Sequence, residues 1–447
     1  MSIASFNSQL APLKTQTINI VTLGCSKNKV DSEHLTALLP FNYFSIQHDS
    51  PEETDIVIIN TCGFIGDAKE ESVETILTYA ESRKEGKIKK LVVMGCLSQR
   101  YKSELSEEIH EVDAFFGVND LQAIAGFLQP KNRIPASENI YHYKRILSTP
   151  SHYAYLKVSE GCDRQCSFCA IPIIRGKHIS VPEEKLVEEA EDLVRQGVKE
   201  IILIAQDLTY YGIDLYGEKR IAQLVQKLST IEGIEWIRLQ YAYPTGFPTE
   251  LLDIIAQNPK VCRYLDLPLQ HISSHILKSM KRGLNKSQTL DLIRIARERI
   301  PGLAFRTTLI TGYPGESEAD FAELIDFVES QRFERLGVFT YSPEEGTSAF
   351  KLQDSVPEEV KIERMEQIME IQQGISLSLN QEKIGLTMKV LIDRIENGFY
   401  IGRTEFDSPE VDNEVLIPDT HQSLQIGEFY NILITQAGDF DLTGIPA

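Results

Sequence analysis

The chain lacks any hydrophobic run long enough to cross a membrane. Within its 447 residues, no stretch approaches the roughly 18 apolar residues that a membrane span requires. The segment from Met1 to Lys14 also has neither the basic start nor the apolar stretch of a signal peptide. We therefore expect a cytoplasmic protein with no membrane partner.

Cysteine is scarce, and the number of cysteines is odd. The chain has seven, and an odd number in a large, unexported protein fits reduced thiols and metal ligands better than a disulfide framework. Positive charge is also in deficit, since 45 basic residues face 65 acidic ones, for a net charge of −20. This balance argues against broad nucleic-acid binding and favours a basic or neutral partner.

Three cysteines form a CxxxCxxC triplet, Cys162, Cys166 and Cys169, just after the apolar alternation at 153–158. Three thiolates can hold three irons of a 4Fe–4S cube and leave the fourth iron open, as a radical S-adenosylmethionine (SAM) enzyme requires. Structural zinc is one alternative, but it usually involves paired CxxC units with histidines at finger spacing, which are missing here. Inert thiols are the other alternative. We interpret the triplet as the ligands of an open cluster.

Three further cysteines, Cys25, Cys62 and Cys96, each close a short apolar run, at 18–25, 55–62 and 91–96. Each run predicts a buried strand, and helical patterns follow, so this segment reads as a repeated β–α unit with a parallel sheet. Ligands of such sheets gather beyond the carboxyl ends of the strands. We therefore predict a second, auxiliary 4Fe–4S cluster on these thiols, with burial as small hydrophobes as the alternative. Cys262 has no other cysteine at a usable spacing, and we interpret it as a structural residue.

The rest of the chain predicts an α/β protein of three domains. Strands alternate with helical patterns from Tyr153 to about Ser376, which indicates a complete or partial TIM-type barrel with its chemistry at the carboxyl ends of the strands. The six expected strands are 153–159, 200–207, 235–241, 264–270, 304–312 and 335–342. The triplet follows the first strand, at the expected end. A linker is predicted over 129–151.

A long charged helix is expected from Pro357 to about Lys383, followed by short alternating runs at 387–395, 399–403, 413–417 and 429–435. These runs predict a small antiparallel β-barrel. The predicted domain limits are residues 1–130, 145–376 and 380–447.

Polar residues at the strand ends are candidates for binding SAM. Gln206 and Gln270 close two strands, and Arg306 lies within a third, where its planar fork could pair with the SAM carboxylate. The alternative is ordinary hydrogen bonding at the barrel mouth or, for Arg306, a salt bridge to Asp207 or Glu316. No side chain is assigned a catalytic acid or base role.

Several of these segments resemble the radical SAM methylthiotransferase family. The motifs that carry the resemblance are GCDRQCSFCAIP at 161–172, TLGCSKNKVDSE at 22–33, NTCGFIGDAKE at 60–70 and YIGRTEFDSPEVD at 400–412. The resemblance covers essentially the whole chain and implies an amino-terminal methylthiotransferase domain, a radical SAM barrel and a carboxyl-terminal TRAM domain. Ser26 departs from the Pro that often follows the first cysteine in the family, a change that affects a loop and no ligand.

The resemblance implies the addition of a methylthio group to the β-carbon of an aspartate in ribosomal protein S-twelve. That carbon has no acidic proton and no leaving group, so the reaction calls for radical chemistry that cofactors supply. The implied cofactors are two 4Fe–4S clusters and SAM: the triplet's cluster cleaves SAM, and the cluster on Cys25, Cys62 and Cys96 supplies the sulfur. An electron donor such as flavodoxin is also implied.

The charge of the terminal domain bears on the substrate, because a related class modifies an adenosine of tRNA. RNA binding requires a positive surface, whereas the segment from Gln381 to Ala447 has twelve acids and four bases, a balance of −8. We therefore expect a basic protein substrate, not nucleic acid, docking on a rigid acidic loop at 405–412. A non-catalytic iron–sulfur protein is a further alternative, but it would hardly need so large a barrel.

Overall fold

The structure, a computed structural model, describes residues 15–129, 145–419 and 423–447. The chain divides into two compact units, Met1–Ser148 and Thr149–Ala447. Most of the predicted linker, 130–144, lies outside the described residues. Across the described ranges, no helix combines the length and the apolar character needed to span a bilayer.

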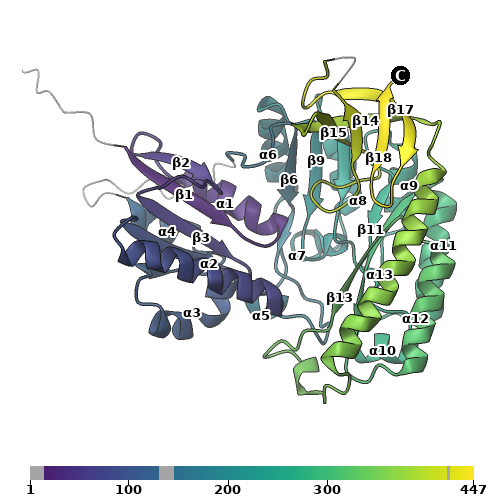
Figure 1. The fold of residues 1–447 in the computed structure, drawn as a ribbon, viewed down its shortest axis with the longest axis horizontal. Coiled ribbons are helices and arrows are strands. Elements are labelled where there is room, and N and C mark those ends of the chain that lie inside the picture. Colours follow the sequence, from purple (N-terminus) through teal and green to yellow (C-terminus); the bar gives the residue numbers. More distant parts are fainter. Residues whose placement is uncertain (1–14, 130–144, 420–422) are drawn as a thin grey trace, which may run out of the picture. The chain divides into compact units, whose positions relative to one another are not determined.

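The first unit is built on a parallel sheet of five strands in the order β2-β1-β3-β4-β5 (Figure 1). The predicted runs before the three cysteines form β1 (Gln16–Thr22), β3 (Ile56–Thr61) and β4 (Lys90–Gly95), which are neighbours in the sheet. Two outer strands complete it, β2 (Phe44–His48) and β5 (Ala114–Phe115). The sequence did not predict these outer strands, because β2 has a single buried residue and β5 is two residues long.

Helices cover both faces of this sheet, as the continuous apolar runs of β3 and β4 require. Alternate strand residues pack on one side with α1 (Ser26–Leu38) and α4 (Leu121–Leu128), and on the other with α2 (Gly66–Lys84) and α3 (Cys96–Glu108). Such a doubly wound sheet has the strand order 2-1-3-4-5, and the direction of winding changes between β1 and β3.

The second unit begins with six parallel strands that confirm the predicted partial barrel. They form two three-stranded sheets, β10-β9-β6 and β11-β12-β13, linked by a parallel bridge from Ile237 to Val261. Their bounds are β6 Tyr153–Lys157, β9 Glu200–Ile204, β10 Trp236–Leu239, β11 Tyr264–Asp266, β12 Ala304–Thr311 and β13 Arg335–Thr340. All five residues of β9 are buried, as expected of a strand covered by helices.

Helices connect these strands in sequence. They are α6 Glu183–Arg195, α7 Ile213–Tyr216, α8 Ile221–Ser229, α9 Glu250–Gln257, α10 Ser274–Ser279, α11 Lys286–Arg299 and α12 Glu318–Gln331. The predicted long helix is α13 (Glu358–Gln381), which packs on α12 and β13 and leads into the last domain (Figure 1).

The chain ends in a closed barrel in the order β14-β15-β16-β18-β17. Its strands are β14 Thr387–Glu396, β15 Phe399–Thr404, β16 Val415–Pro418, β17 Phe429–Ala437 and β18 Leu442–Pro446. The small barrel predicted from the sequence is confirmed, with two differences. A fifth strand, β18, was not expected, and it pairs with β16 in parallel, so the barrel is not wholly antiparallel.

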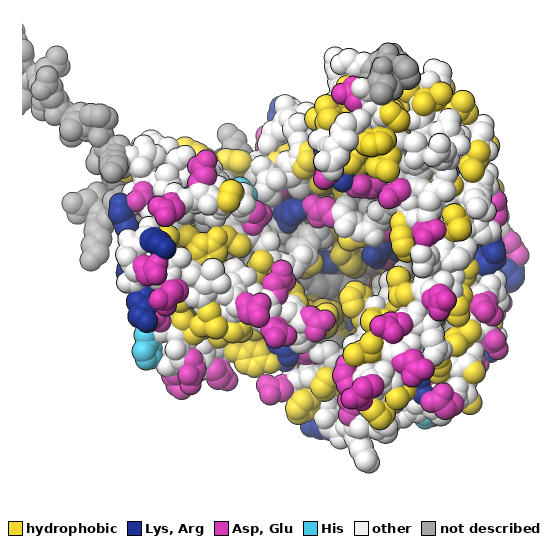
Figure 2. Space-filling view, in the orientation of Figure 1, with side chains coloured by type: hydrophobic (Ala, Val, Ile, Leu, Met, Phe, Trp, Pro, Cys, Tyr) yellow, Lys and Arg dark blue, Asp and Glu magenta, His cyan; other side chains and the backbone are white. Residues whose placement is uncertain are grey.

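Carboxylates cover two outer surfaces of the molecule. Figure 2 shows acidic side chains over the region of α2 in the first unit and over α13 in the second. On α13 the exposed acids are Glu358, Glu359, Glu363, Glu366 and Glu370, and on α2 they are Asp67, Glu70, Glu71, Glu74 and Glu81. The basic residues Lys361 and Arg364 of α13 are buried, so this helix presents a one-sided negative face to solvent.

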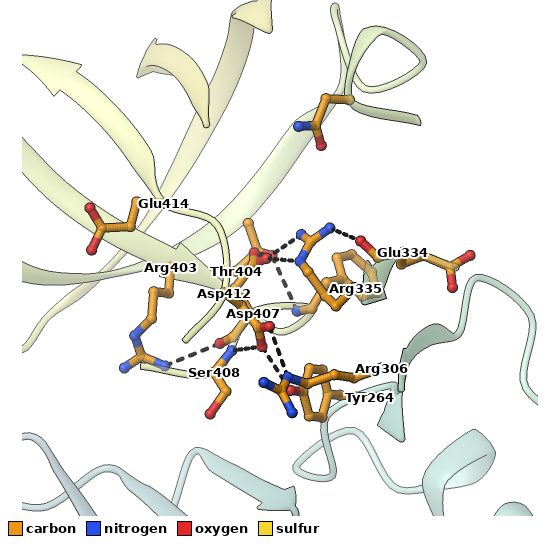
Figure 3. Close-up of polar contacts among 12 residues, drawn as sticks. Tyr264, Arg306, Glu334, Arg335, Arg403, Thr404, Asp407, Ser408, Asp412 and Glu414 are labelled. Carbon is orange, nitrogen blue, oxygen red and sulfur yellow. Dashed lines mark hydrogen bonds and ion pairs between the residues drawn. The ribbon is translucent and has the colours of Figure 1, made fainter. Parts of the chain in front are cut away.

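The acidic loop at 405–412 is not the free docking loop that the sequence predicted. Its four carboxylates contact barrel residues, namely Glu405 with Arg263, Asp407 with Arg335, Glu410 with Tyr153 and Tyr155, and Asp412 with Tyr264 and Arg306. Figure 3 shows the Asp407 and Asp412 contacts. The prediction was wrong because the charges that neutralise this loop are distant in the sequence.

These contacts attach the small barrel to one end of the large one. Tyr153, Tyr264 and Arg335 are the first residues of β6, β11 and β13, so the loop meets the amino-terminal ends of the strands. The cysteine triplet follows β6 at the opposite end. The amino-terminal end of such a barrel serves stability, whereas chemistry occurs at the carboxyl end.

The Arg335–Asp407 pair is expected to hold the two barrels together. The Arg335 and Asp407 side chains are 6% and 3% exposed, so Asp407→Asn would leave a buried guanidinium without its counter-charge, at a cost of about 3–5 kcal/mol. Trp236, the single tryptophan, lies 4.8 Å from the Phe429 ring of the small barrel and reports on their contact. We expect its fluorescence to reveal unfolding at a lower urea concentration in the variant.

The control for this prediction is Asp419→Asn, which removes the same charge from an exposed side chain in the same barrel. It should leave the urea midpoint unchanged. Equal midpoints for Asp407→Asn and the wild type would contradict the role of the buried pair.

Candidate functional site

The cysteine triplet lies in a loop at the carboxyl end of β6. The loop is framed by a short hairpin of β7 (Ser159–Glu160) and β8 (Ile179–Ser180), and it runs into α5 (Ile171–Arg175). Gly161 opens the loop with a φ of +73°, and a Cβ at this position would lie 2.0 Å from the Lys177 carbonyl oxygen. Glycine is therefore required here, because any side chain would push the hairpin away from the loop.

The three thiols share one electrostatic environment. Burial raises the pKa of Cys162 to about 11 and that of Cys169 to about 12, and the nearby Cys166 opposes the ionisation of both. Thiolates must form if these residues are to bind metal, so a bound cation has to offset the cost. Iron bound by the three sulfurs would supply that positive charge.

Neither cysteine set resembles a site for a single ion. Among the described residues, no group of three His, Cys, Asp or Glu side chains could hold one metal ion. A cube differs from structural zinc in this respect, because each of the three thiolates binds its own iron.

Two arginines that the sequence did not single out contact the cysteine triplet. Arg282 Nη1 donates to Cys166 Sγ at 3.2 Å, and the Tyr243 hydroxyl lies 3.4 Å from the same sulfur. The Arg164 backbone N–H donates to Cys162 Sγ at 3.4 Å, and its guanidinium lies 4.2 Å from the Tyr243 ring and pairs with Asp207 at 2.7 Å. Arg282 is far from the triplet in sequence and follows no motif used above, so no sequence signal pointed to it.

Gln206 is held beside the triplet loop by an ion cluster. Glu160 accepts from Lys157 Nζ at 2.7 Å, from Arg175 Nη1 at 2.9 Å and from Gln206 Nε2 at 2.9 Å. Burial opposes the ionisation of Glu160, but Lys157 and Arg175 outweigh it and lower its pKa to about 2. Gln206 is thus oriented through its amide nitrogen, and its buried Oε1 finds no partner in the described part of the chain.

Gln270 lies beyond β11 in a left-handed backbone conformation, with a φ of +74°. The backbone N–H of Gln270 donates to the Thr308 carbonyl at 2.8 Å, which fixes this position against β12. Tyr241, just beyond β10, has a φ of +63°. Such conformations cost about 1–3 kcal/mol and cluster at functional sites, so the barrel mouth carries strain at two adjacent strand ends.

Arg306 differs from the sequence expectation. Its guanidinium donates through Nε to Asp412 at 3.2 Å and through Nη1 to Asp266 at 3.3 Å. The planar fork that could have paired with a SAM carboxylate is therefore committed to two protein carboxylates. The salt-bridge alternative was right in kind but wrong in its partners, which are neither Asp207 nor Glu316.

The other three cysteines lie where the sequence placed them, at the carboxyl ends of adjacent strands in the first unit. Cys25 caps α1 after β1, Cys62 follows β3 and Cys96 opens α3 directly after β4. The first two flank the point where the winding of the sheet reverses. Open α/β sheets bind ligands in the crevice at this point.

Close backbone packing brings these cysteines near one another. A Cβ on Gly24 would lie 2.9 Å from Cys62 Sγ, so only glycine lets the Cys25 loop approach this closely. The Asn28 side chain donates to the carbonyls of Leu23 and Thr61, and its Oδ1 lies 3.8 Å from Cys96 Sγ. One buried amide thus joins the ends of all three strands, which a chance burial of three thiols would not require.

Three family models match successive parts of the chain. "Uncharacterized protein family UPF0004" matches residues 17–117, "Radical SAM superfamily" matches 156–328 and "TRAM domain" matches 384–446. The six candidate cysteines fall within the first two matches.

Curated relatives match the chain over nearly its whole length. A protein of Cytophaga hutchinsonii named ribosomal protein uS12 methylthiotransferase RimO is 54% identical over 428 residues, which cover 96% of this chain and 97% of the relative. A protein of the same name from Bacteroides thetaiotaomicron is 53% identical over 432 residues, covering 96% and 98%.

Solved structures share the fold at low identity. The radical SAM methyltransferase TsrM of Kitasatospora setae, solved with cobalamin and a [4Fe-4S] cluster bound, has a TM-score of 0.54 at 14% identity, covering 87% of this chain and 81% of that one. A second structure of TsrM has a TM-score of 0.52. This likeness extends to the fold alone.

Proposed function

The chain belongs to the family of ribosomal protein uS12 methylthiotransferases, and we propose on this basis that it adds a methylthio group to the β-carbon of an aspartate of uS12. In this reaction a C–H bond of the substrate breaks and a C–S bond forms at the same carbon. That carbon lacks an acidic proton, so no acid or base side chain of the protein could activate it.

One observation carries the proposal. The chain has two sets of three cysteines, one at the carboxyl ends of three parallel strands in the first unit and one in the loop after the first barrel strand of the second. A tRNA-modifying enzyme would share both sets. An electron carrier would need neither the six-stranded barrel nor a cluster with an open iron.

The proposed cofactors are SAM and two 4Fe–4S clusters, one on Cys162, Cys166 and Cys169 and an auxiliary one on the Cys25 set. When bound, the cluster on the triplet supplies the electron that cleaves SAM, and the auxiliary cluster supplies the sulfur that is transferred. The residues fit these groups, because the thiols of the triplet lie close enough to oppose one another's ionisation and the loops that carry Cys25, Cys62 and Cys96 meet around Asn28.

For SAM we propose contacts to Gln206 and Gln270, while Arg306 has the structural role described above. Gln206 is oriented by Glu160 at 2.9 Å and has an unpartnered Oε1 near the triplet loop. An amide oxygen suits the ammonium group of SAM. The left-handed backbone of Gln270 directs that residue away from the regular strand path.

Charge supports a basic protein as the partner. Because three of the four carboxylates of the loop at 405–412 pair with arginines of the barrel, we propose the exposed acidic faces of α2 and α13 as the surfaces that attract this partner. Direct binding of nucleic acid is disfavoured by the net charge of −20. We further propose a cytoplasmic location, a flavodoxin-like electron donor and the three-domain division at 1–130, 145–376 and 380–447.

The test of the proposed function is mass spectrometry of uS12 from cells that lack this gene. We expect the methylthio increment on the aspartate to be missing, to return with the wild-type gene and to stay missing with a Cys162→Ala gene. Nucleoside analysis of tRNA from the same cells should be unchanged. Loss of a methylthiolated adenosine with an unaltered uS12 would favour the tRNA-modifying alternative instead.

A further inference from the structure

Arg282 is buried in an unusual way for a charged residue. It follows α10, where Lys281 adopts a left-handed backbone with a φ of +57° and turns the chain back, so that the Arg282 amide donates to the Leu277 carbonyl at 3.0 Å. As a result Arg282 is 5% exposed, although its neighbours Lys281 and Gly283 lie at the surface. The turn therefore directs a guanidinium into the barrel.

No carboxylate neutralises this guanidinium. Seven arginines are buried in the described ranges, and six of them pair with a carboxylate: Arg145, Arg175, Arg238, Arg335, Arg364 and Arg403. Arg282 is the exception within those ranges. It contacts Cys166 Sγ at 3.2 Å, the Pro268 carbonyl and the face of the Tyr243 ring at 4.4 Å, and its Nε has no partner.

An uncompensated buried charge is costly, at several kcal/mol per ion after relaxation. The chain tolerates that cost at Arg282 although it avoids it at the other six buried arginines. The anion that would offset it must therefore come from a bound group. The nearest candidate is the sulfur to which Arg282 already donates, once that sulfur is a thiolate ligand.

We propose that Arg282 is a positioning residue of the radical-forming cluster, whose charge it compensates through the Cys166 sulfur. The inference rests on the proposed function, because it assumes a cluster on the triplet. Accepting one electron makes a cluster more negative, and a guanidinium at hydrogen-bond distance stabilises that reduced form more than the oxidised one. Hydrogen bonds to the sulfurs and nearby charge are among the factors that set cluster potentials. Arg282 thus raises the reduction potential and eases electron entry.

The test is the midpoint potential of this cluster, measured by redox titration with electron paramagnetic resonance in the absence of SAM. The full-length C25A/C62A/C96A variant is used as the parent, so that a single cluster gives the signal. In this parent, Arg282→Gln should favour the oxidised form at least tenfold, a shift of about 59 mV to more negative potential for one electron. Arg282→Lys, which keeps the charge, should shift it less than half as far.

The matched control is Lys281→Gln, which removes the positive charge of the neighbouring residue. The Lys281 side chain is exposed, and its Nζ contacts Ser348 at 3.2 Å. It should leave the potential unchanged. Iron content of every variant is measured first, and loss of iron from Arg282→Gln but not from Arg282→Lys also supports charge compensation.

Two results would overturn the inference. An unchanged SAM-free potential in Arg282→Gln, together with SAM binding weakened at least tenfold, would make Arg282 a SAM ligand. Equal shifts in Arg282→Gln and Arg282→Lys would make it a packing residue. Failure of the cluster assignment on which the inference rests is distinct from both, because the parent with Arg282 intact would then bind no iron at the triplet. Failure of the uS12 assignment is read separately, from the mass of uS12 in cells that lack this gene.

Discussion

Replacing Cys25, Cys62 and Cys96 together with alanine is expected to abolish transfer of the methylthio group while SAM cleavage continues. The three residues end β1, β3 and β4 in the first unit, whereas the triplet that serves SAM cleavage belongs to the second. Removing the first set should therefore leave the radical-forming site intact and remove only the source of sulfur. The measurements are deoxyadenosine release and the mass of isolated uS12 after incubation with SAM and reductant.

The control is Cys262→Ala. Cys262 is 1% exposed and packs with Trp236 and Tyr264, so it represents an ordinary buried cysteine. Its replacement should leave both activities in place apart from a modest loss of stability. Methylthio transfer at the normal yield by the triple variant would identify Cys25, Cys62 and Cys96 as buried structure.

The sequence predicted the parts of the fold that local pattern determines. The apolar stretches at 56–59 and 201–204 identified strands that are covered on both faces. The cysteines that follow β1, β3, β4 and β6 located the two candidate sites. The outer strand β2 and the final strand β18 were missed because their burial alternates weakly and depends on neighbours distant in sequence.

Charge was harder to interpret than periodicity. Counting acids correctly described the small barrel as negative, but it could not tell that Asp407 neutralises Arg335, a partner 72 residues away. The same limitation gave Arg306 a cofactor role and overlooked Arg282. A sequence shows how many charges a domain has, whereas the fold decides which of them remain free.

The barrel arginines show that the two ends of the barrel have different roles. Arg306 and Arg335 meet the small barrel near the amino-terminal ends of their strands, where every guanidinium finds a carboxylate. Arg282 lies by the triplet at the opposite end, where the guanidinium finds a cysteine sulfur instead. Stability and chemistry are thus carried by different ends of one barrel, which predicts that mutations at the two ends have different signatures.

Replacing Cys162, Cys166 and Cys169 with alanine is expected to have the complementary effect and eliminate SAM cleavage altogether. Two cubes with three protein ligands each would give about eight irons per chain after anaerobic reconstitution, so this variant should retain about four. No other described thiol of the second unit could substitute. Cys262 is only 1% exposed and is buried in the barrel core beside Trp236. Both deoxyadenosine release and methylthio transfer should fall to background.

The alanine variant of the Cys25 set serves as its control, since it should also retain about four irons and yet still release deoxyadenosine. If the two alanine variants retain equal amounts of iron but only one of them releases deoxyadenosine, each cluster is assigned to its own function. Urea unfolding followed by Trp236 fluorescence excludes a general loss of structure, because that residue reports on the other end of the barrel. Deoxyadenosine release by the variant lacking Cys162, Cys166 and Cys169 would show that the radical-forming site lies elsewhere in the chain.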